Sequence, residues 1–283
     1  MRRARKVIAM VGVLVGVVIC VWPIVADVMC SLRMSEMEQD LVRAEGTDEE
    51  REFYLRQARA YNDVLAGIAV DVPDGGLIPY DDQLSWQGKP YMSYLKVPVA
   101  HISMPVWHGC ADPELASGAG HLEGTSLPVG GSRALCVLEG HSGMMTSRMF
   151  DDIRSLAVGD VACLWTLAEP YAYRVESMSV VMPDDVAALA HEMDGDKLML
   201  VTCTSEPDFI NRYGRIGVND RRLVVMLSRC EYDPAAFGEE SSPVIEAVTS
   251  PRARLPIIGL VVVLLAFVLH RLWVRRRVVV QRY

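Results

Sequence analysis

The chain has 283 residues, with 36 acidic and 28 basic side chains and a formal net charge of −8. Nine basic side chains lie in the two terminal tails, so the rest of the chain carries 19 basic side chains against 36 acidic ones. Such an acidic surface repels phosphate backbones and anionic lipid headgroups, which excludes nucleic-acid binding as the function.

The first predicted element is a transmembrane helix. Residues 7–26 (VIAMVGVLVGVVICVWPIVA) contain no charged side chain. A helix of this length spans a hydrocarbon core about 30 Å thick. We therefore predict that residues 1–30 form a cytoplasmic tail and a membrane anchor. A cleaved signal peptide is the alternative, but the apolar stretch is long for one and no A-x-A site is evident near its end.

Residues 31–90 are predicted to form N-terminal helices and a lid-like loop. The stretch 31–67 is rich in Glu, Arg, Ala and Leu, with apolar side chains at helical spacing. Gly46 and Thr47 precede three acidic residues, which is typical of a break followed by a helix N-cap, so we expect two helices. Residues 70–90 hold three prolines, three glycines and four aspartates and are predicted to be a loop.

The next part of the chain, residues 91–230, is predicted to be an all-β domain. From Tyr94 the apolar pattern has a period of two, in short runs separated by Gly, Pro and Asp clusters. Several short strands at this spacing indicate a barrel or a sandwich. Residues 160–182 are predicted to be a hairpin that turns at Glu169 and Pro170, and residues 149–156 a short helix. Residues 231–254 are polar and are predicted to be a linker.

A second transmembrane helix is predicted within residues 255–274. Residues 255–269 are uncharged, and Arg254 and Arg271 at the ends can extend their charged groups to the membrane interfaces. Residues 275–283 form a basic tail. Because basic flanks stay in the cytoplasm, both termini are predicted to be cytoplasmic and residues 27–254 to be outside the cell.

Seven cysteines are present, but no C-x-x-C pair, H-E-x-x-H motif or acidic cluster accompanies them. We therefore predict no metal site and no cofactor. Cys136 and Cys163 lie in apolar runs and are predicted to be small core residues.

Cys203 is the best candidate for a nucleophile. It ends the apolar run LMLVTC, where a strand would leave the core, and Arg222 begins the next strand run. Antiparallel pairing of the two strands would bring these residues together. Arginine keeps its charge and presents several donors, which suits it to hold a carbonyl oxygen that becomes negative. Taken singly, a strand cysteine is more often a core residue and a strand-end arginine more often a solvated one.

His141 is the candidate acid–base residue. It lies between two small residues after the strand run RALCVLEG, and imidazole titrates near neutral pH. It could protonate a leaving amine and deprotonate an incoming one. His121, in GAGHLEGTSLP, is predicted instead to fix a loop through hydrogen bonds.

Several stretches resemble the sortases, the membrane-anchored cysteine transpeptidases of Gram-positive bacteria, and within them class C, the pilin-polymerising branch. The matching stretches are KVPVAHISMPVWHG (96–109), LASGAGHLEGTSLPVGG (115–131), LEGHSGMMTSRMFDDI (138–153), GDVACLW (159–165), LVTCT (200–204) and NDRRLVV (219–225). The resemblance implies a mainly β fold, a closed eight-stranded sortase-type barrel with N-terminal helices and two flanking transmembrane helices. It also implies Cys203 as nucleophile, His141 as acid–base residue and Arg222 as the group that stabilises the oxyanion.

The sequence departs from the class C pattern in two places. Class C members often cover the site with a lid that carries Asp-Pro-aromatic, whereas the region GGLIPYDDQLSW has no Asp before its Pro; Tyr80 and Trp86 are the lid candidates here. The link from Cys203 to Arg222 is also long, and it contains Arg212 and Arg215, which together with Arg221 are alternatives to Arg222.

The resemblance implies cleavage of an LPxTG-like C-terminal sorting signal on secreted pilins or surface proteins, through a thioacyl intermediate. The acceptor is expected to be an amine, and the first candidate is a pilin lysine. Three alternatives stay open. They are a sortase that uses a peptidoglycan amine, a cysteine hydrolase and a membrane-anchored binding module without catalysis.

Overall fold

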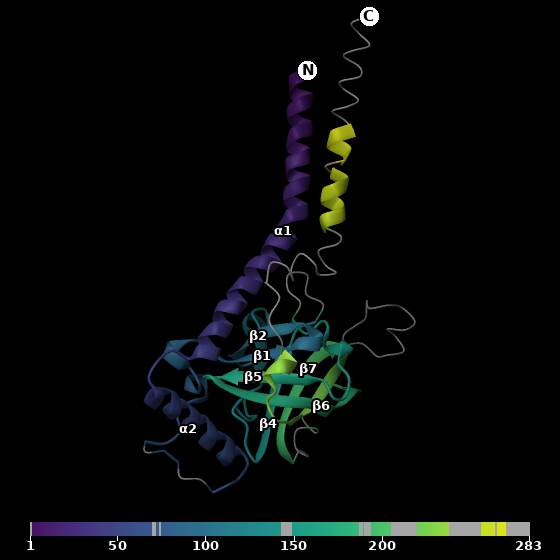
Figure 1. Ribbon diagram of the computed structural model, residues 1–283. Coiled ribbons are helices and arrows are strands. Elements are labelled where there is room, and N and C mark those ends of the chain that lie inside the picture. Colours follow the sequence, from purple (N-terminus) through teal and green to yellow (C-terminus); the bar gives the residue numbers. More distant parts are fainter. Residues whose placement is uncertain are drawn as a thin grey trace, which may run out of the picture. The chain divides into compact units, whose positions relative to one another are not determined.

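The computed structural model describes residues 2–69, 72–73, 75–142, 149–186, 189, 194–204, 220–237, 256–263 and 265–269 (Figure 1). The chain divides into two compact units, one made of residues 1–33 and 239–283 and the other of residues 34–238. The finer domain boundaries predicted from the sequence stay predictions.

Helix α1 (Arg2–Arg43) contains the predicted membrane anchor and continues without a break into the first predicted N-terminal helix. Within the described ranges, it is the one helix long and apolar enough to cross a membrane. Apolar side chains such as Leu14, Val18 and Trp22 are more than half exposed on it, which is costly in water and favourable in lipid. The predicted second span appears as a shorter apolar helix, Pro256–Leu269.

Helix α2 (Asp48–Leu65) follows the predicted break. Thr47 is its N-cap, and the Thr47 hydroxyl accepts a hydrogen bond from the Glu50 backbone N–H at 3.2 Å. Three acidic residues in the first turn face the positive end of the helix dipole, which favours a helix start at this point. The prediction of two N-terminal helices is therefore confirmed.

Eight strands close into a barrel, which confirms the predicted fold class. The strand order is β1-β2-β3-β4-β7-β8-β6-β5, with parallel pairing of β2 with β3 and of β4 with β7. The strands are β1 (Tyr91–Val97), β2 (Ile102–His108), β3 (Ala119–His121), β4 (Arg133–Gly140), β5 (Val161–Thr166), β6 (Glu169–Val181), β7 (Gly195–Thr204) and β8 (Arg221–Arg229). The short helix α3 (Asp112–Leu115) precedes β3.

The barrel has an inner core and a smaller apolar cluster on its outer face. In β7, Leu198 and Leu200 belong to the inner core, whereas Met199 and Val201 belong to the outer cluster. Val137 of β4 and Val224 and Met226 of β8 complete the buried part of that outer cluster. Strand β7 is therefore buried on both faces, which explains its continuous apolar sequence.

Two local predictions need correction. The β5–β6 hairpin turns at Leu167 and Ala168, both with positive φ (48° and 67°), so Glu169 and Pro170 already belong to β6. The predicted short helix over residues 149–156 is reduced to one 3₁₀ turn, Ile153–Ser155, and no side-chain hydrogen bond from its N-cap residue Asp152 stabilises a longer helix there.

Candidate active site

Cys203, His141 and Arg222 lie at the same edge of three neighbouring strands. Cys203 of β7 pairs directly with Arg222 of β8. Gly140, the last residue of β4, pairs with Thr202, so His141 follows one step further, beside Cys203. Since neighbouring strands are about 4.8 Å apart, the three residues form a row roughly 10 Å long with the thiol in the middle.

The alternation of side chains assigns Cys203 and Arg222 to the outer face of the barrel. Cys203 has the same parity as Val201 in β7, and Arg222 has the same parity as Val224 in β8, and both valines belong to the outer cluster. Cys203, His141 and Arg222 are all half-buried. A thiol on this face lies outside the barrel wall, so a peptide would not have to enter the barrel to meet it.

The same alternation places Arg222 and Arg221 on opposite faces of β8. Arg221 pairs with Thr204 and has the same parity as Leu223, which belongs to the inner core. The Arg222 guanidinium donates a hydrogen bond from Nη1 to the Arg221 carbonyl at 3.2 Å. Arg212 and Arg215, the other predicted alternatives, lie outside the described residues.

The backbone around His141 is held on several sides. The Thr202 hydroxyl donates to the Gly140 carbonyl at 2.7 Å, and the Ser142 hydroxyl donates to the Cys203 carbonyl at 2.8 Å. The His141 carbonyl accepts from the Phe150 N–H at 2.9 Å. The first two bonds tie the end of β4 to the end of β7, so the backbone that carries the imidazole lies beside the backbone that carries the thiol.

Gly140 is a residue whose importance the sequence did not reveal. A Cβ on Gly140 would lie 2.6 Å from the ring of Phe150, a side chain that is fully buried. Real Cβ atoms do not approach a ring that closely, so any side chain at position 140 would displace Phe150. The glycine before His141 thus lets the backbone at the end of β4 lie directly against the buried ring of Phe150.

Tyr80, one lid candidate, is joined to the barrel by a buried polar network. Its hydroxyl lies 2.9 Å from Nδ1 of His121 and accepts from the Gly109 N–H at 3.0 Å. Nε2 of His121 lies 2.9 Å from the Ser126 carbonyl, so Nε2 carries the proton and Nδ1 accepts from Tyr80. Burial lowers the pKa of His121 to about 4. His121 therefore fixes a loop, as predicted, and stays neutral.

Trp86, the other lid candidate, is a core residue. It is 2% exposed and makes an edge-to-face contact with Tyr54 of α2 at 6.2 Å. A Cβ on Gly46 would lie 2.4 Å from the indole ring, so the break between α1 and α2 leaves the space that Trp86 fills. A role for Trp86 as a lid remains a prediction that this packing does not favour.

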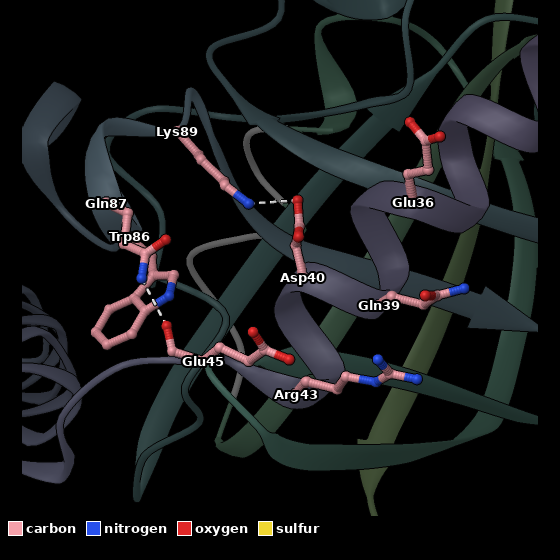
Figure 2. Close-up of a pocket in the computed structure, with 8 residues that line it drawn as sticks. All are labelled: Glu36, Gln39, Asp40, Arg43, Glu45, Trp86, Gln87 and Lys89. Carbon is pink, nitrogen blue, oxygen red and sulfur yellow. Dashed lines mark hydrogen bonds and ion pairs between the residues drawn. The ribbon is translucent and has the colours of Figure 1, made fainter.

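A polar pocket of about 320 Å³ lies beside Trp86 (Figure 2). Its wall includes Asp40 of α1, which forms an ion pair with Lys89 and accepts a hydrogen bond from the Tyr91 hydroxyl at 2.7 Å. Gln87 donates to the Glu45 carbonyl at 2.6 Å. These bonds connect the end of α1 and the residues after it to the segment before β1, so the pocket is a seam between them.

The cysteines outside the candidate site are free thiols, and two of them are core residues. Cys136 and Cys163 are buried, as predicted, and burial raises the pKa of both thiols, that of Cys163 to about 12. They are therefore poor nucleophiles. Among the described residues, no group of three or more His, Cys, Asp or Glu side chains could hold a metal ion.

Comparison with known proteins gives the family. The family model of the sortase domain matches residues 95–227. Sortase A of Bacillus anthracis is 29% identical over 125 residues, which is 44% of this chain and 58% of that protein. The chain thus matches less than two thirds of the length of this curated relative.

Several solved sortase structures are similar to a larger share of this chain. Sortase C-1 from Actinomyces oris is 33% identical and has a TM-score of 0.53, with 64% of this chain and 99% of that chain covered. Sortase C1 from Streptococcus agalactiae is 30% identical with a TM-score of 0.59, covering 71% and 99%. Sortase A from Corynebacterium diphtheriae is 28% identical with a TM-score of 0.56, covering 73% and 94%. The chain belongs to the sortase family, whose members are cysteine transpeptidases.

Proposed function

We propose that this chain is a membrane-anchored transpeptidase that cleaves an LPxTG-like sorting signal and joins it to an amine. The observation that carries the proposal is the row of imidazole, thiol and guanidinium across β4, β7 and β8. In the proposed roles Cys203 is the nucleophile, His141 the acid–base residue and Arg222 the donor to the oxyanion.

The first half of the reaction is acylation of Cys203. The thiolate attacks the scissile carbonyl carbon, a C–S bond forms and the carbonyl oxygen becomes negative. Arg222 donates N–H groups to that oxygen while it carries charge. The C–N bond then breaks, and His141 protonates the departing amine. The products are a thioester on Cys203 and a released C-terminal fragment.

The second half is transfer of the acyl group. An amine attacks the thioester carbon, His141 takes the proton from the attacking nitrogen, and the C–S bond breaks to regenerate the Cys203 thiolate. Arg222 again stabilises the oxyanion. Because the free energy of the thioester drives the step, no cofactor enters the reaction.

We infer a pilin lysine as the acceptor. Class C sortases are among the most similar structures, and one of them is described as the sortase C1 of a pilus island. The similarity to sortase A of two organisms supports transfer to a cell-wall amine as the second candidate. Only the acceptor differs between the two, so the acylation chemistry is shared.

The proposed location is the cell membrane, with two spans and both termini in the cytoplasm. Two observations support this location: the N-terminal apolar helix, and the basic residues that lie between each apolar segment and the nearer end of the chain. An anchored enzyme would meet secreted substrates where they leave the membrane.

Tyr80 is the lid candidate we retain, because its network reaches β3, which is adjacent to β4.

The test uses the full chain in detergent micelles, a peptide that contains Leu-Pro-Glu-Thr-Gly, and a second peptide with a single lysine. Mass spectrometry separates the amide product, the free acid and unreacted peptide. We expect the amide product, no turnover with Cys203→Ala, and a rate about 100-fold lower with Arg222→Ala. Cys230→Ala, at another half-buried cysteine, is the matched control and should retain the wild-type rate.

Each alternative has its own outcome in this assay. Free acid as the main product in the presence of amine would indicate a hydrolase. Amide product with a peptidoglycan stem peptide but none with the lysine peptide would favour wall anchoring. No turnover, with Cys203 unreactive toward a methanethiosulfonate reagent, would indicate a binding module and overturn the proposal.

A further inference from the structure

Glu139 is a carboxylate beside the candidate site that the proposed mechanism does not use. It lies in β4, two residues before His141, and has the same parity as Val137 of the outer cluster. Strand alternation therefore directs it to the face that carries Cys203 and Arg222. The side chain is half-buried, which is unusual for an ionisable group without a function or a partner.

The space on one side of Glu139 is shaped by a glycine. Gly120 of β3 pairs with Glu139 across the sheet. A Cβ on Gly120 would lie 2.5 Å from the Gly109 carbonyl oxygen and 3.0 Å from Cα of Cys110. The chain after β2 thus folds over Gly120 and sets the Cys110 thiol against Glu139. The burial that results disfavours a carboxylate with no countercharge.

Arg222 is within reach on the other side. Glu139 pairs with Val201 of β7, and Val201 pairs with Val224 of β8. Arg222 is two residues from Val224 on the same face, so the two Cα atoms are separated by roughly 10 Å across the strands and roughly 7 Å along them. Extended glutamate and arginine side chains are together long enough to span this diagonal, which crosses β7 between Val201 and Cys203.

The electrostatics agree with this placement. Burial raises the pKa of the Glu139 carboxyl, and the positive charge of Arg222 is the largest opposing influence, followed by the Cys110 thiol. On the other side of the contact, burial and Glu139 raise the pKa of Cys110 to about 12, so this thiol stays neutral at physiological pH. Glu139 therefore interacts with one cation and one neutral donor.

We propose that Glu139 is a positioning residue that draws the Arg222 guanidinium across β7 and holds it beside the Cys203 thiol. The inference rests on the proposed function of Arg222 as the oxyanion donor. An arginine side chain has many rotamers, and fixing the catalytically useful one during each turnover costs rotamer entropy. If the Glu139 carboxylate holds one side of the Arg222 guanidinium before the substrate binds, the N–H groups on the other side stay directed at the substrate oxygen. This arrangement raises the rate of acylation.

The experiment compares Glu139→Gln, Arg222→Ala and the double variant of the full chain in detergent, with the Leu-Pro-Glu-Thr-Gly peptide as probe. We expect Glu139→Gln to lower kcat about tenfold and to leave KM within about twofold. In the Arg222→Ala background the same change should alter kcat less than about twofold, because the group it positions is gone. Glu139→Asp should recover part of the rate.

The matched control is Glu176→Gln, which removes another strand carboxylate that pairs with a cation, Lys197, on an exposed part of β6. It should leave kcat unchanged. An equal loss of kcat from Glu139→Gln in both backgrounds would overturn the proposal, since Glu139 would then act without Arg222.

A second measurement does not depend on activity. If Glu139 and Arg222 interact, the thermal midpoint of the double variant falls by less than the sum of the two single changes. Additive midpoints would also overturn the proposal. Non-additive midpoints in a protein that turns over no peptide would instead retain the pairing and reject the proposed function.

Discussion

Two histidines of this chain show how surroundings decide the role of a residue. His121 is fully buried, and both of its ring nitrogens lie within hydrogen-bond distance of Tyr80 and the Ser126 carbonyl. His141 is half-buried at the end of a strand, next to Cys203. Both occur in Gly-His sequences, so residue type and neighbours alone do not separate a structural imidazole from a chemical one.

The buried state of His121 predicts how stability depends on pH. The folded-state pKa is about 4, against an ordinary value of 6.5, because burial disfavours the charged ring and His108 adds positive charge nearby. Between these pH values the unfolded chain binds more protons, so the free energy of unfolding falls as the pH drops from 6.5 to 4. The fall amounts to at most about 3 kcal/mol.

Urea unfolding of the wild type and of His121→Asn, each at pH 7 and at pH 4.5, checks this prediction. The difference in unfolding free energy between the two proteins should shrink at the lower pH, because only the wild type loses the contribution of a neutral imidazole. Other titrating carboxyls act equally on both proteins. A difference that is the same at both pH values would contradict the prediction.

At the scale of elements, local sequence patterns predict where the strands are better than they predict which strands lie next to each other in the barrel. Alternation and turn residues indicated an all-β domain, and the approach of Arg222 to Cys203 followed from two strands consecutive in the chain. The position of His141 depends on parallel pairing of β4 with β7, whose residues are about sixty positions apart in register. No periodicity records such a pairing, so before the fold was known only the family resemblance supplied it.

The packing of Trp86 likewise depends on residues that are remote from it in the sequence. Trp86 is a lid candidate because it lies in GGLIPYDDQLSW, the region that matches the lid of class C sortases. Its pocket is formed by Gly46 and Tyr54, which are remote in sequence and meet it only after α1 and α2 pack on the barrel. Burial of a loop aromatic depends on tertiary contacts that composition does not encode.

Helix α2 makes one contact whose removal should be costly. The Asn62 side chain accepts from the Leu127 N–H at 2.7 Å and donates to the carbonyls of Leu127 and Gly130 at 3.0 and 2.9 Å. Asn62 is 2% exposed, so Asn62→Ala leaves buried backbone groups without partners. We expect the free energy of unfolding to fall by about 2–4 kcal/mol.

Urea unfolding of the full chain in detergent measures this loss, with Arg56→Ala, an exposed position on the same helix, as the control. The control should change the free energy of unfolding by less than about 0.5 kcal/mol. A loss no larger than that of the control would mean that α2 contributes little to holding the loop at residues 127–130.

For the whole molecule, charge and hydrophobicity are distributed in a way that matches an anchored external enzyme. The residues between the two apolar segments carry the acidic excess, whereas the tails carry only basic side chains. A soluble domain gains nothing from this separation. A membrane protein does, because basic flanks are retained in the cytoplasm and set the orientation of the spans.

The proposed two-span topology can be tested with two fusions to green fluorescent protein, which does not become fluorescent when exported as an unfolded chain. One fusion follows Tyr283, at the end of the basic tail, and the other follows Phe237, which removes the second apolar segment. If the segment at residues 255–269 crosses the membrane, the first fusion is fluorescent and the second is dark, at equal protein amounts by immunoblot. A dark Tyr283 fusion would show that this segment does not return the chain to the cytoplasm. A fluorescent Phe237 fusion would show that the barrel is not exported. The basic residues before the first span would then not set the orientation that we predict.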